Sequence, residues 1–206
     1  MTYENLRKKV INQPLFTFND ILKWFPKINP KTLEVELSRW RKDNKLIGVK
    51  KGIYWLKEKK LSDPFIVANF IYNPSYISLE SALNYYSIIP DIPFAVTSVT
   101  VKKTAQFKNK DLGNFTYRHL KPELFWGYET VQANKVYNYN VATPEKALLD
   151  YIYLNAQEIP IDGFPDELRF YFEKFEWQKF SHYSKTVPQK NIKFHKLIDI
   201  LLKKYA

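Results

Sequence analysis

Residues 29–56 read NPKTLEVELSRWRKDNKLIGVKKGIYWL, and they give the clearest indication of how the first part of the chain folds. Asn29 is a good helix N-cap and Pro30 a good first helical residue, so a helix is predicted from there to about Asn44. Its apolar positions follow the spacing i, i+4, i+7 and form the inward stripe: Leu33, Leu37 and Trp40. The opposite face is polar and basic, apart from one valine: Lys31, Val35, Ser38, Arg39 and Lys42, with Thr32 beside them. Such a face is what a helix entering a DNA major groove needs.

A hairpin follows this helix. Apolar residues alternate on its two strands, Ile47 with Val49 on the first and Ile53 with Trp55 on the second. The segment 50–52, Lys-Lys-Gly, makes the turn, with the glycine supplying a positive φ. We expect Lys50 and Lys51 to contact flanking DNA backbone, while Val35 meets a thymine methyl group.

Two short helices are predicted before residue 29. The apolar spacing of Leu6, Val10 and Ile11 indicates the first, which closes before Pro14. Thr17 to Asp20 supply capping residues for the second, and Pro26 ends it. Three helices and a two-stranded hairpin in about sixty residues are typical of a winged helix-turn-helix. A winged helix that makes protein contacts is the alternative.

Charge is concentrated in the same part of the chain. The net charge is +11, and residues 1–60 hold 15 basic and 6 acidic residues. Residues 61–155 hold 8 of each, and residues 156–206 hold 9 basic and 7 acidic residues. A basic first third joined to a neutral body favours contact with a polyanion. A solvated lysine-rich face is the plainer interpretation.

Composition excludes several classes of site. The 206 residues are 45% hydrophobic, which is ordinary for a globular protein, and they include no cysteine and only 3 histidines. Disulfides, thiol catalysis and cysteine-ligated metals are therefore excluded, and we expect no metal and no cofactor. No apolar run approaches the roughly 20 residues that span a bilayer. The segment 1–9 leads into no signal-peptide core, so a cytoplasmic protein without a membrane partner is expected.

The rest of the sequence, from residue 57 onward, predicts an α+β domain. A polar linker, 57–62, divides a domain of residues 1–60 from one of residues 61–206. Helices are predicted at 65–72, from Ser78 to near Ile89, from Thr143 onward, and at about 166–175 and 191–205. Strands are predicted at 94–101, 115–120, 125–128 and 136–141. The fold class is thus a winged helix-turn-helix followed by a larger mixed α/β domain and C-terminal helices.

An ordered series of short segments resembles the AbiEi family of antitoxins, from type IV toxin–antitoxin and abortive-infection operons. The segments are Tyr76–Leu83, Val96–Thr100, Lys102–Thr104, Asn114-Phe115 with Tyr117, Gly127-Tyr128 and Ala142–Asp150. The resemblance covers about residues 1–155, because members of that family also begin with a winged helix.

The resemblance implies a phage-defence antitoxin that represses transcription of its own operon. Its partners would be operator DNA and a nucleotidyltransferase toxin encoded beside it. The sequence does not show whether the second domain touches the toxin directly. It also does not give the operator sequence, the oligomeric state or the role of the C-terminal helices.

Other polar clusters have plainer explanations. Ser78, Glu80 and Ser81 are interpreted as residues that cap and line a helix start. A basic run could bind toxin or nucleic-acid phosphate, or form a solvated loop: Lys102, Lys103, Lys108 and Lys110. No catalytic motif is present, so no catalytic residue is assigned and the protein is not expected to be an enzyme.

Two further hypotheses stay open. One is a protein–protein module that neutralises a toxin by direct contact, with DNA binding secondary. The other is a metal-dependent nuclease that uses Glu80, Glu145 or Asp150, although the spacing of Glu145, Lys146 and Asp150 on a predicted helix is wrong for one.

Overall fold

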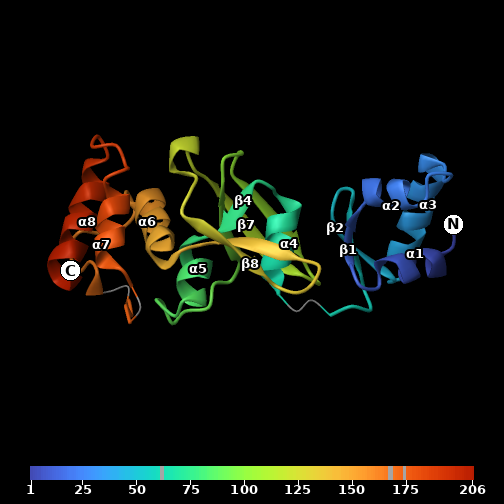
Figure 1. Ribbon diagram of the computed structural model, residues 1–206, viewed down its shortest axis with the longest axis horizontal. Helices are drawn as coiled ribbons and strands as arrows, with labels where there is room; N and C mark the ends of the chain where they lie inside the picture. The colour runs from blue at the N-terminus through green and yellow to red at the C-terminus, as the bar shows by residue number, and fades with distance from the viewer. Residues whose placement is uncertain (61–62, 167–168, 174) are drawn as a thin grey trace.

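The chain is elongated, and its two termini lie at opposite ends (Figure 1). The computed structural model describes residues 1–60, 63–166, 169–173 and 175–206. Within these ranges it has eight α-helices, one short 3-10 helix and two sheets, so the α+β class is confirmed. No helix in the described ranges is both long enough and apolar enough to span a bilayer. We call residues 1–60 the N-terminal unit and residues 63–206 the second unit.

The N-terminal unit combines three helices with a small antiparallel sheet. Its helices are α1 (Tyr3–Val10), α2 (Phe18–Trp24) and α3 (Pro30–Lys42). Its strands are β1 (Leu15–Thr17), β2 (Leu46–Lys50) and β3 (Ile53–Leu56), in the order β1-β3-β2. Thr17 and Asp20 form a reciprocal capping box at the start of α2. Leu6, Phe16, Leu33, Leu37 and Trp40 are among the fully or almost fully buried residues of its core.

The small sheet is buried on both faces. Residues such as Leu46 and Leu56 point into the core that the three helices cover. The alternating residues of the other face, Ile47, Val49 and Trp55, belong to a second core shared with the rest of the chain. The alternation predicted for the hairpin is therefore confirmed, and the second unit covers the face that α1–α3 leave open.

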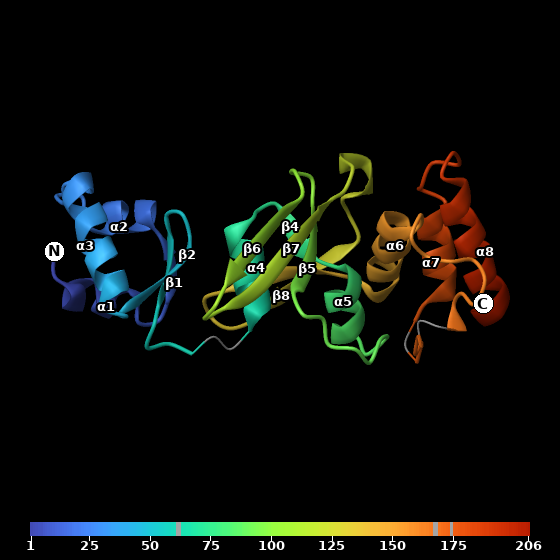
Figure 2. The same ribbon diagram turned by 180° about the vertical axis from the view of Figure 1, so that it is seen from behind.

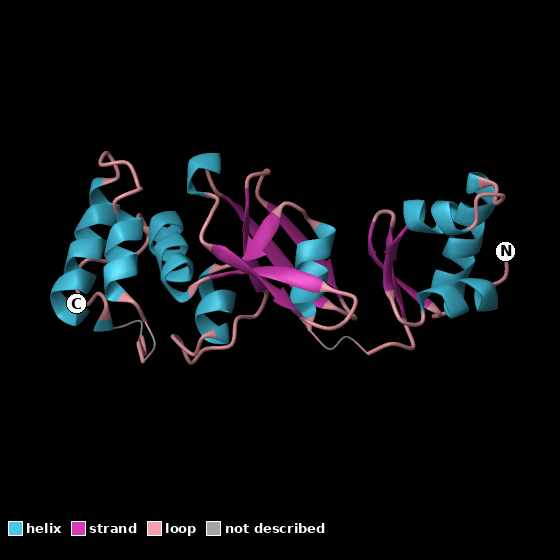
Figure 3. Ribbon diagram, in the orientation of Figure 1, coloured by secondary structure: helices cyan, strands magenta, loops and turns pink. Residues whose placement is uncertain are grey.

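The second unit is built on a mixed sheet, the larger group of magenta strands in Figure 3. It has six strands in the order β6-β7-β5-β4-β9-β8. The strands are β4 (Ser75–Ile77), β5 (Val96–Thr100), β6 (Ala105–Asn109), β7 (Gly113–His119), β8 (Tyr128–Gln132) and β9 (Asn138–Ala142). β4 pairs parallel with β9, and β5 pairs parallel with β7, while the other pairs are antiparallel.

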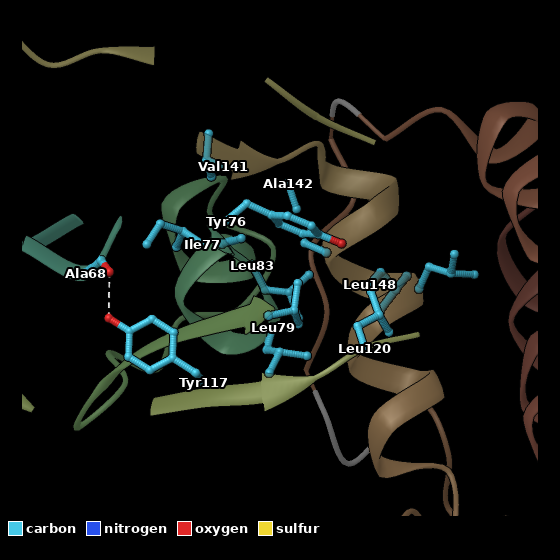
Figure 4. Close-up of a cluster of buried hydrophobic side chains, with 14 of the residues drawn as sticks. Ala68, Tyr76, Ile77, Leu79, Leu83, Tyr117, Leu120, Val141, Ala142 and Leu148 are labelled. Carbon is cyan, nitrogen blue, oxygen red and sulfur yellow. Dashed lines mark hydrogen bonds between the residues drawn. The ribbon is translucent and has the colours of Figure 1, made fainter. Parts of the chain in front are cut away.

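Helices cover both faces of this sheet. They are α4 (Pro64–Ile71), α5 (Leu79–Tyr85) and α6 (Pro144–Asn155), with the 3-10 turn η1 (Pro122–Leu124) between β7 and β8. On one face the Tyr117 hydroxyl donates to the Ala68 carbonyl oxygen of α4 at 2.6 Å (Figure 4). On the other face Arg118 donates to the Leu154 carbonyl oxygen of α6 at 3.0 Å. Because Tyr117 and Arg118 are neighbours on β7, their side chains reach opposite faces.

Two C-terminal helices, α7 (Trp177–Ser184) and α8 (Ile192–Tyr205), lie beyond α6 at the end farthest from the N-terminal unit (Figure 2). Aromatic contacts tie them to the preceding segment: Trp177 stacks on Tyr205 with ring centroids 5.4 Å apart, and Phe172 contacts both rings. The C-terminal helices thus extend the second unit and do not fold back toward the N-terminal unit.

Most predicted elements are confirmed with small shifts in their bounds. The predicted helix from Ser78 ends at Tyr85, before the expected Ile89. Four strands were not predicted, namely β1, β4, β6 and, apart from its first residue, β8, and neither was α7. Residues 61 and 62 of the predicted linker lie outside the described residues.

Two predicted elements are wrong. Residues 125–128 do not form a strand: Trp126 donates to the Glu123 carbonyl oxygen, Gly127 has a φ of 74°, and β8 starts only at Tyr128. The described residues of 166–175 form no α-helix, and the others in that range (167, 168 and 174) lie outside the described residues. The rings of Phe170 and Phe172 contact each other with centroids 5.4 Å apart. Side chains two residues apart lie on the same side of an extended segment but not of a helix.

Candidate nucleic-acid interface

Helix α3 presents the residues that the sequence assigns to DNA. The Asn29 side chain accepts from the backbone N–H groups of Lys31 at 2.9 Å and Thr32 at 3.4 Å, which starts the helix. Leu33, Leu37 and Trp40 point into the core and are at most 2% exposed. The outward residues are all at least partly exposed: Lys31, Thr32, Val35, Ser38, Arg39 and Lys42. The predicted division of α3 into a core face and a solvent face is therefore confirmed.

Two side chains on this face have particular surroundings. Val35 is 67% exposed, which is high for a branched apolar side chain and leaves its methyl groups free for contact. Arg39 Nη2 lies 2.5 Å from Glu36 Oε2, one turn back along the helix. An exposed ion pair of this kind contributes at most about 1 kcal/mol. The Arg39 guanidinium can therefore exchange Glu36 for a stronger acceptor at small cost.

The two lysines of the β2–β3 turn have different environments. Lys51 is exposed beside Gly52, whose φ of 75° makes the turn. Lys50 is half-buried: its Nζ donates to the Ile71 carbonyl oxygen at 3.0 Å and lies 4.6 Å from the Phe107 ring centroid. Burial, together with the nearby charge of Lys102, lowers the pKa of Lys50. Of the pair, Lys51 keeps the exposure that a phosphate contact needs.

The four lysines of the predicted basic run in the second unit are not one cluster. All four are exposed: Lys102, Lys103, Lys108 and Lys110. Lys102 and Lys103 precede β6, and the Lys102 Nζ donates to the Asn73 carbonyl oxygen. Lys110 lies at the other end of β6, where it shares a cleft with Ser38 and Lys42 of α3. Lys110 is thus the lysine of this run that lies beside the surface of α3.

Sequence reasoning missed Arg41. Its side chain lies over Gly48 of β2, so closely that a Cβ atom at residue 48 would come within 2.7 Å of Arg41 Nε. Arg41 is exposed and lines the same cleft as Lys42 and Lys110. A glycine inside a strand indicates a close approach by another group, and Gly48 was the available signal.

Two of the segments that carry the family resemblance meet in a buried polar network on the α6 side of the second sheet. The Tyr76 hydroxyl and Ser78 Oγ donate to Asp150 Oδ2 at 2.9 and 2.8 Å, and Lys146 Nζ pairs with Asp150 Oδ1. All four residues are at most 1% exposed. Burial lowers the pKa of Lys146 and raises that of Asp150, each opposed by the charge of the other. Such a closed set of partners ties β4 to α6 and leaves no group facing a substrate.

The network corrects the interpretation of Ser78. Ser78 stands at the N-cap position of α5, but its side chain makes no capping hydrogen bond because its Oγ donates to Asp150 instead. Ser81 instead bonds the neighbouring strand, with its Oγ accepting from the Thr97 backbone N–H at 2.8 Å.

The acidic residues of the nuclease hypothesis are not brought together. Asp150 is enclosed by the network, whereas Glu145 Oε2 lies 2.9 Å from Lys179 Nζ of α7 and Glu145 Oε1 accepts from the Glu176 backbone N–H. Glu80 lines a separate pocket with Tyr151 and Phe164. Across the ranges that the structure describes, no three His, Asp or Glu side chains are grouped so that they could hold a metal ion.

In comparisons with known proteins, no family model matches the chain, and no curated protein matches it.

Proposed function

We propose that the protein is a sequence-specific DNA-binding autorepressor and that its N-terminal unit is a winged helix-turn-helix. The observation that carries the proposal is the division of α3 into a buried apolar face and an exposed polar and basic face. Lys31, Thr32, Ser38 and Arg39 would contact base edges or nearby phosphates, and Val35 would contact a thymine methyl group. The excess of basic residues in residues 1–60 supports the same role.

The antitoxin part of the proposal rests on the resemblance to the AbiEi family. On this proposal the protein is the antitoxin of a type IV toxin–antitoxin operon in phage defence and antagonises a nucleotidyltransferase toxin. Two of the resembling segments supply the buried network of Tyr76, Ser78, Lys146 and Asp150, so they serve the scaffold of the second unit. Growth rescue on co-expression with the product of the neighbouring gene tests this part.

The DNA-binding part is tested by fluorescence anisotropy. The probes are the duplex just upstream of the gene and a scrambled duplex of equal length, each at two salt concentrations. A specific repressor prefers the first by about a thousandfold or more, and its affinity falls as salt rises. Weak and equal binding to both duplexes would contradict the proposal.

A second candidate is a module that neutralises the toxin by direct contact. It is favoured by two apolar side chains in the loop after α5, because Ile92 is 86% exposed and Phe94 is 91% exposed. Large apolar side chains that lie close together in the chain and are exposed are typical of protein contact sites. Co-purification of the two proteins, lost on changing both residues to serine, would support this candidate.

A further inference from the structure

Asn109 ties the turn between β6 and β7 to the N-terminal unit. Asn109 Oδ1 accepts from the backbone N–H groups of Asp111 at 3.0 Å and Leu112 at 3.2 Å, which shapes the turn. The Nδ2 atom of the same side chain donates to the Gly48 carbonyl oxygen of β2 at 3.0 Å. Asn109 therefore sets both the shape of the turn and its position against β2.

A second tie lies two residues further on. Asp111 Oδ1 pairs with Lys57 Nζ, just after β3. The Asp111 carboxylate is thereby engaged by a cation of the N-terminal unit. Lys110, between the two tethered residues, is exposed and has its charge available to a partner.

These ties create a cleft of about 390 Å³ between the two units. One wall is formed by Ser38, Arg41 and Lys42, at the C-terminal half of α3. The other wall is formed by the turn, with Lys110 in it. Three cationic side chains from two units thus line one cleft, and the carboxylate among the lining residues is the one that Lys57 neutralises.

We propose that this cleft binds the sugar–phosphate backbone of duplex DNA and that Lys110 contacts a phosphate while α3 reads the adjacent major groove. The inference rests on the proposed DNA-binding function and extends it, because it makes the second unit part of the DNA-binding surface. Ser38 and Lys42 belong both to the outward face of α3 and to the cleft, so a duplex on that face runs into the cleft.

The chemistry fits a backbone contact and not a base contact. Phosphates attract clustered Lys and Arg side chains and carry no sequence information. Because Asn109 and Asp111 hold the turn before any ligand arrives, little backbone entropy is lost when Lys110 meets its phosphate.

The test uses the full chain and compares Lys110→Ala with Lys121→Ala. Lys121 is an exposed lysine of the same second unit that precedes η1, beyond the end of β7 opposite to the β6–β7 turn. Affinities for the upstream duplex and a scrambled duplex are measured over a range of salt. We expect Lys110→Ala to weaken binding to both duplexes by about fivefold and to reduce the salt slope by about one. Lys121→Ala and the charge-preserving Lys110→Arg should keep the slope of the unchanged protein.

The outcomes separate the inference from the function on which it rests. If the unchanged protein discriminates between the duplexes but Lys110→Ala behaves like Lys121→Ala, the cleft does not bind DNA and the repressor function stands. If the unchanged protein shows no preference, the repressor function fails and the inference fails with it. Circular dichroism of each variant shows whether a loss of affinity comes from unfolding.

Discussion

The hydroxyl of Tyr137 makes two hydrogen bonds to the backbone of Leu15, accepting from its N–H group at 2.8 Å and donating to its carbonyl oxygen at 3.0 Å. Leu15 begins β1, an edge strand of the small sheet, and Tyr137 precedes β9 in the second unit. One side chain thus satisfies two backbone groups that an edge strand would otherwise leave without a partner. Burial at this contact raises the pKa of Tyr137 to about 12.

The first prediction concerns this contact. Tyr137→Phe removes both hydrogen bonds and leaves two buried backbone groups unpaired, so it should lower the free energy of unfolding by about 1–3 kcal/mol. Urea denaturation followed by tryptophan fluorescence measures the change. Tyr171→Phe is the matched control, because Tyr171 is 58% exposed and the same substitution there should cost little. Equal effects of the two substitutions would argue against a role for the hydroxyl of Tyr137.

The second prediction separates base contacts from backbone contacts. Arg39→Ala should weaken binding to the operator more than binding to a random duplex, since a guanidinium reads base edges. Lys51→Ala should weaken both about equally and reduce the salt slope by about one, since it removes one phosphate contact. Anisotropy titrations at several salt concentrations measure both quantities. Identical patterns for the two variants would refute this assignment of roles.

The third prediction contrasts the two lysines of the β2–β3 turn. Lys50→Ala removes the hydrogen bond to Ile71 and the contacts with the rings of Tyr72 and Phe107, so stability should fall by about 1–2 kcal/mol. Its salt slope in DNA binding should match that of the unchanged protein. Lys51→Ala should show the reverse, with stability retained and the slope reduced. A reduced slope for Lys50→Ala would mean that its ammonium group reaches DNA after all.

The fourth prediction concerns the buried ion pair. Lys146→Met leaves the Asp150 carboxylate buried without its cation and should cost about 3–5 kcal/mol. In the variant, burial raises the pKa of Asp150 with no lysine to oppose it. A carboxyl whose pKa is raised in the folded state is most favourable to folding below its unfolded value and loses that advantage as pH rises through the folded value.

The penalty of Lys146→Met should therefore shrink as the pH is lowered from neutral through the raised folded-state pKa of Asp150 toward about 4, the ordinary value of the carboxyl in the unfolded chain. Chemical denaturation of both proteins at neutral and acid pH measures the difference. Asp150→Asn combined with Lys146→Met is the control, since it removes the titrating group and should flatten the pH dependence of the penalty. A penalty that is constant with pH in Lys146→Met would exclude Asp150 as its source.

The fifth prediction follows from the shared face of the small sheet. A fragment of residues 1–60 exposes Ile47, Val49 and Trp55, which the second unit covers in the full chain. The fragment should self-associate or unfold at a lower temperature than the full chain. Thermal unfolding and size-exclusion chromatography measure both. A monomeric fragment with the melting temperature of the full chain would show that the N-terminal unit does not need this cover.

Much of the local structure could be predicted from the sequence because it depends on near neighbours. Asn29 and Pro30 start α3, Leu33, Leu37 and Trp40 define its inner face, and Thr143 with Pro144 starts α6. Caps and apolar periodicity act within one or two helical turns, so the residues that decide them are close together in the chain. The same reasoning gave the exposed face of α3.

The tertiary structure decided which of these surfaces remain free. The alternation in β2 and β3 predicted one apolar face, but only the folded chain shows that the second unit covers that face and draws Lys50 in with it. Residues far apart in sequence also meet: Asn109 with Gly48, and Tyr76 with Asp150. Such pairs depend on the packing of whole elements, which no local pattern encodes. Local patterns in the sequence thus account for most of the helices, their caps and the polar face of α3, whereas the cleft that joins Lys110 to α3 exists only because two units pack together.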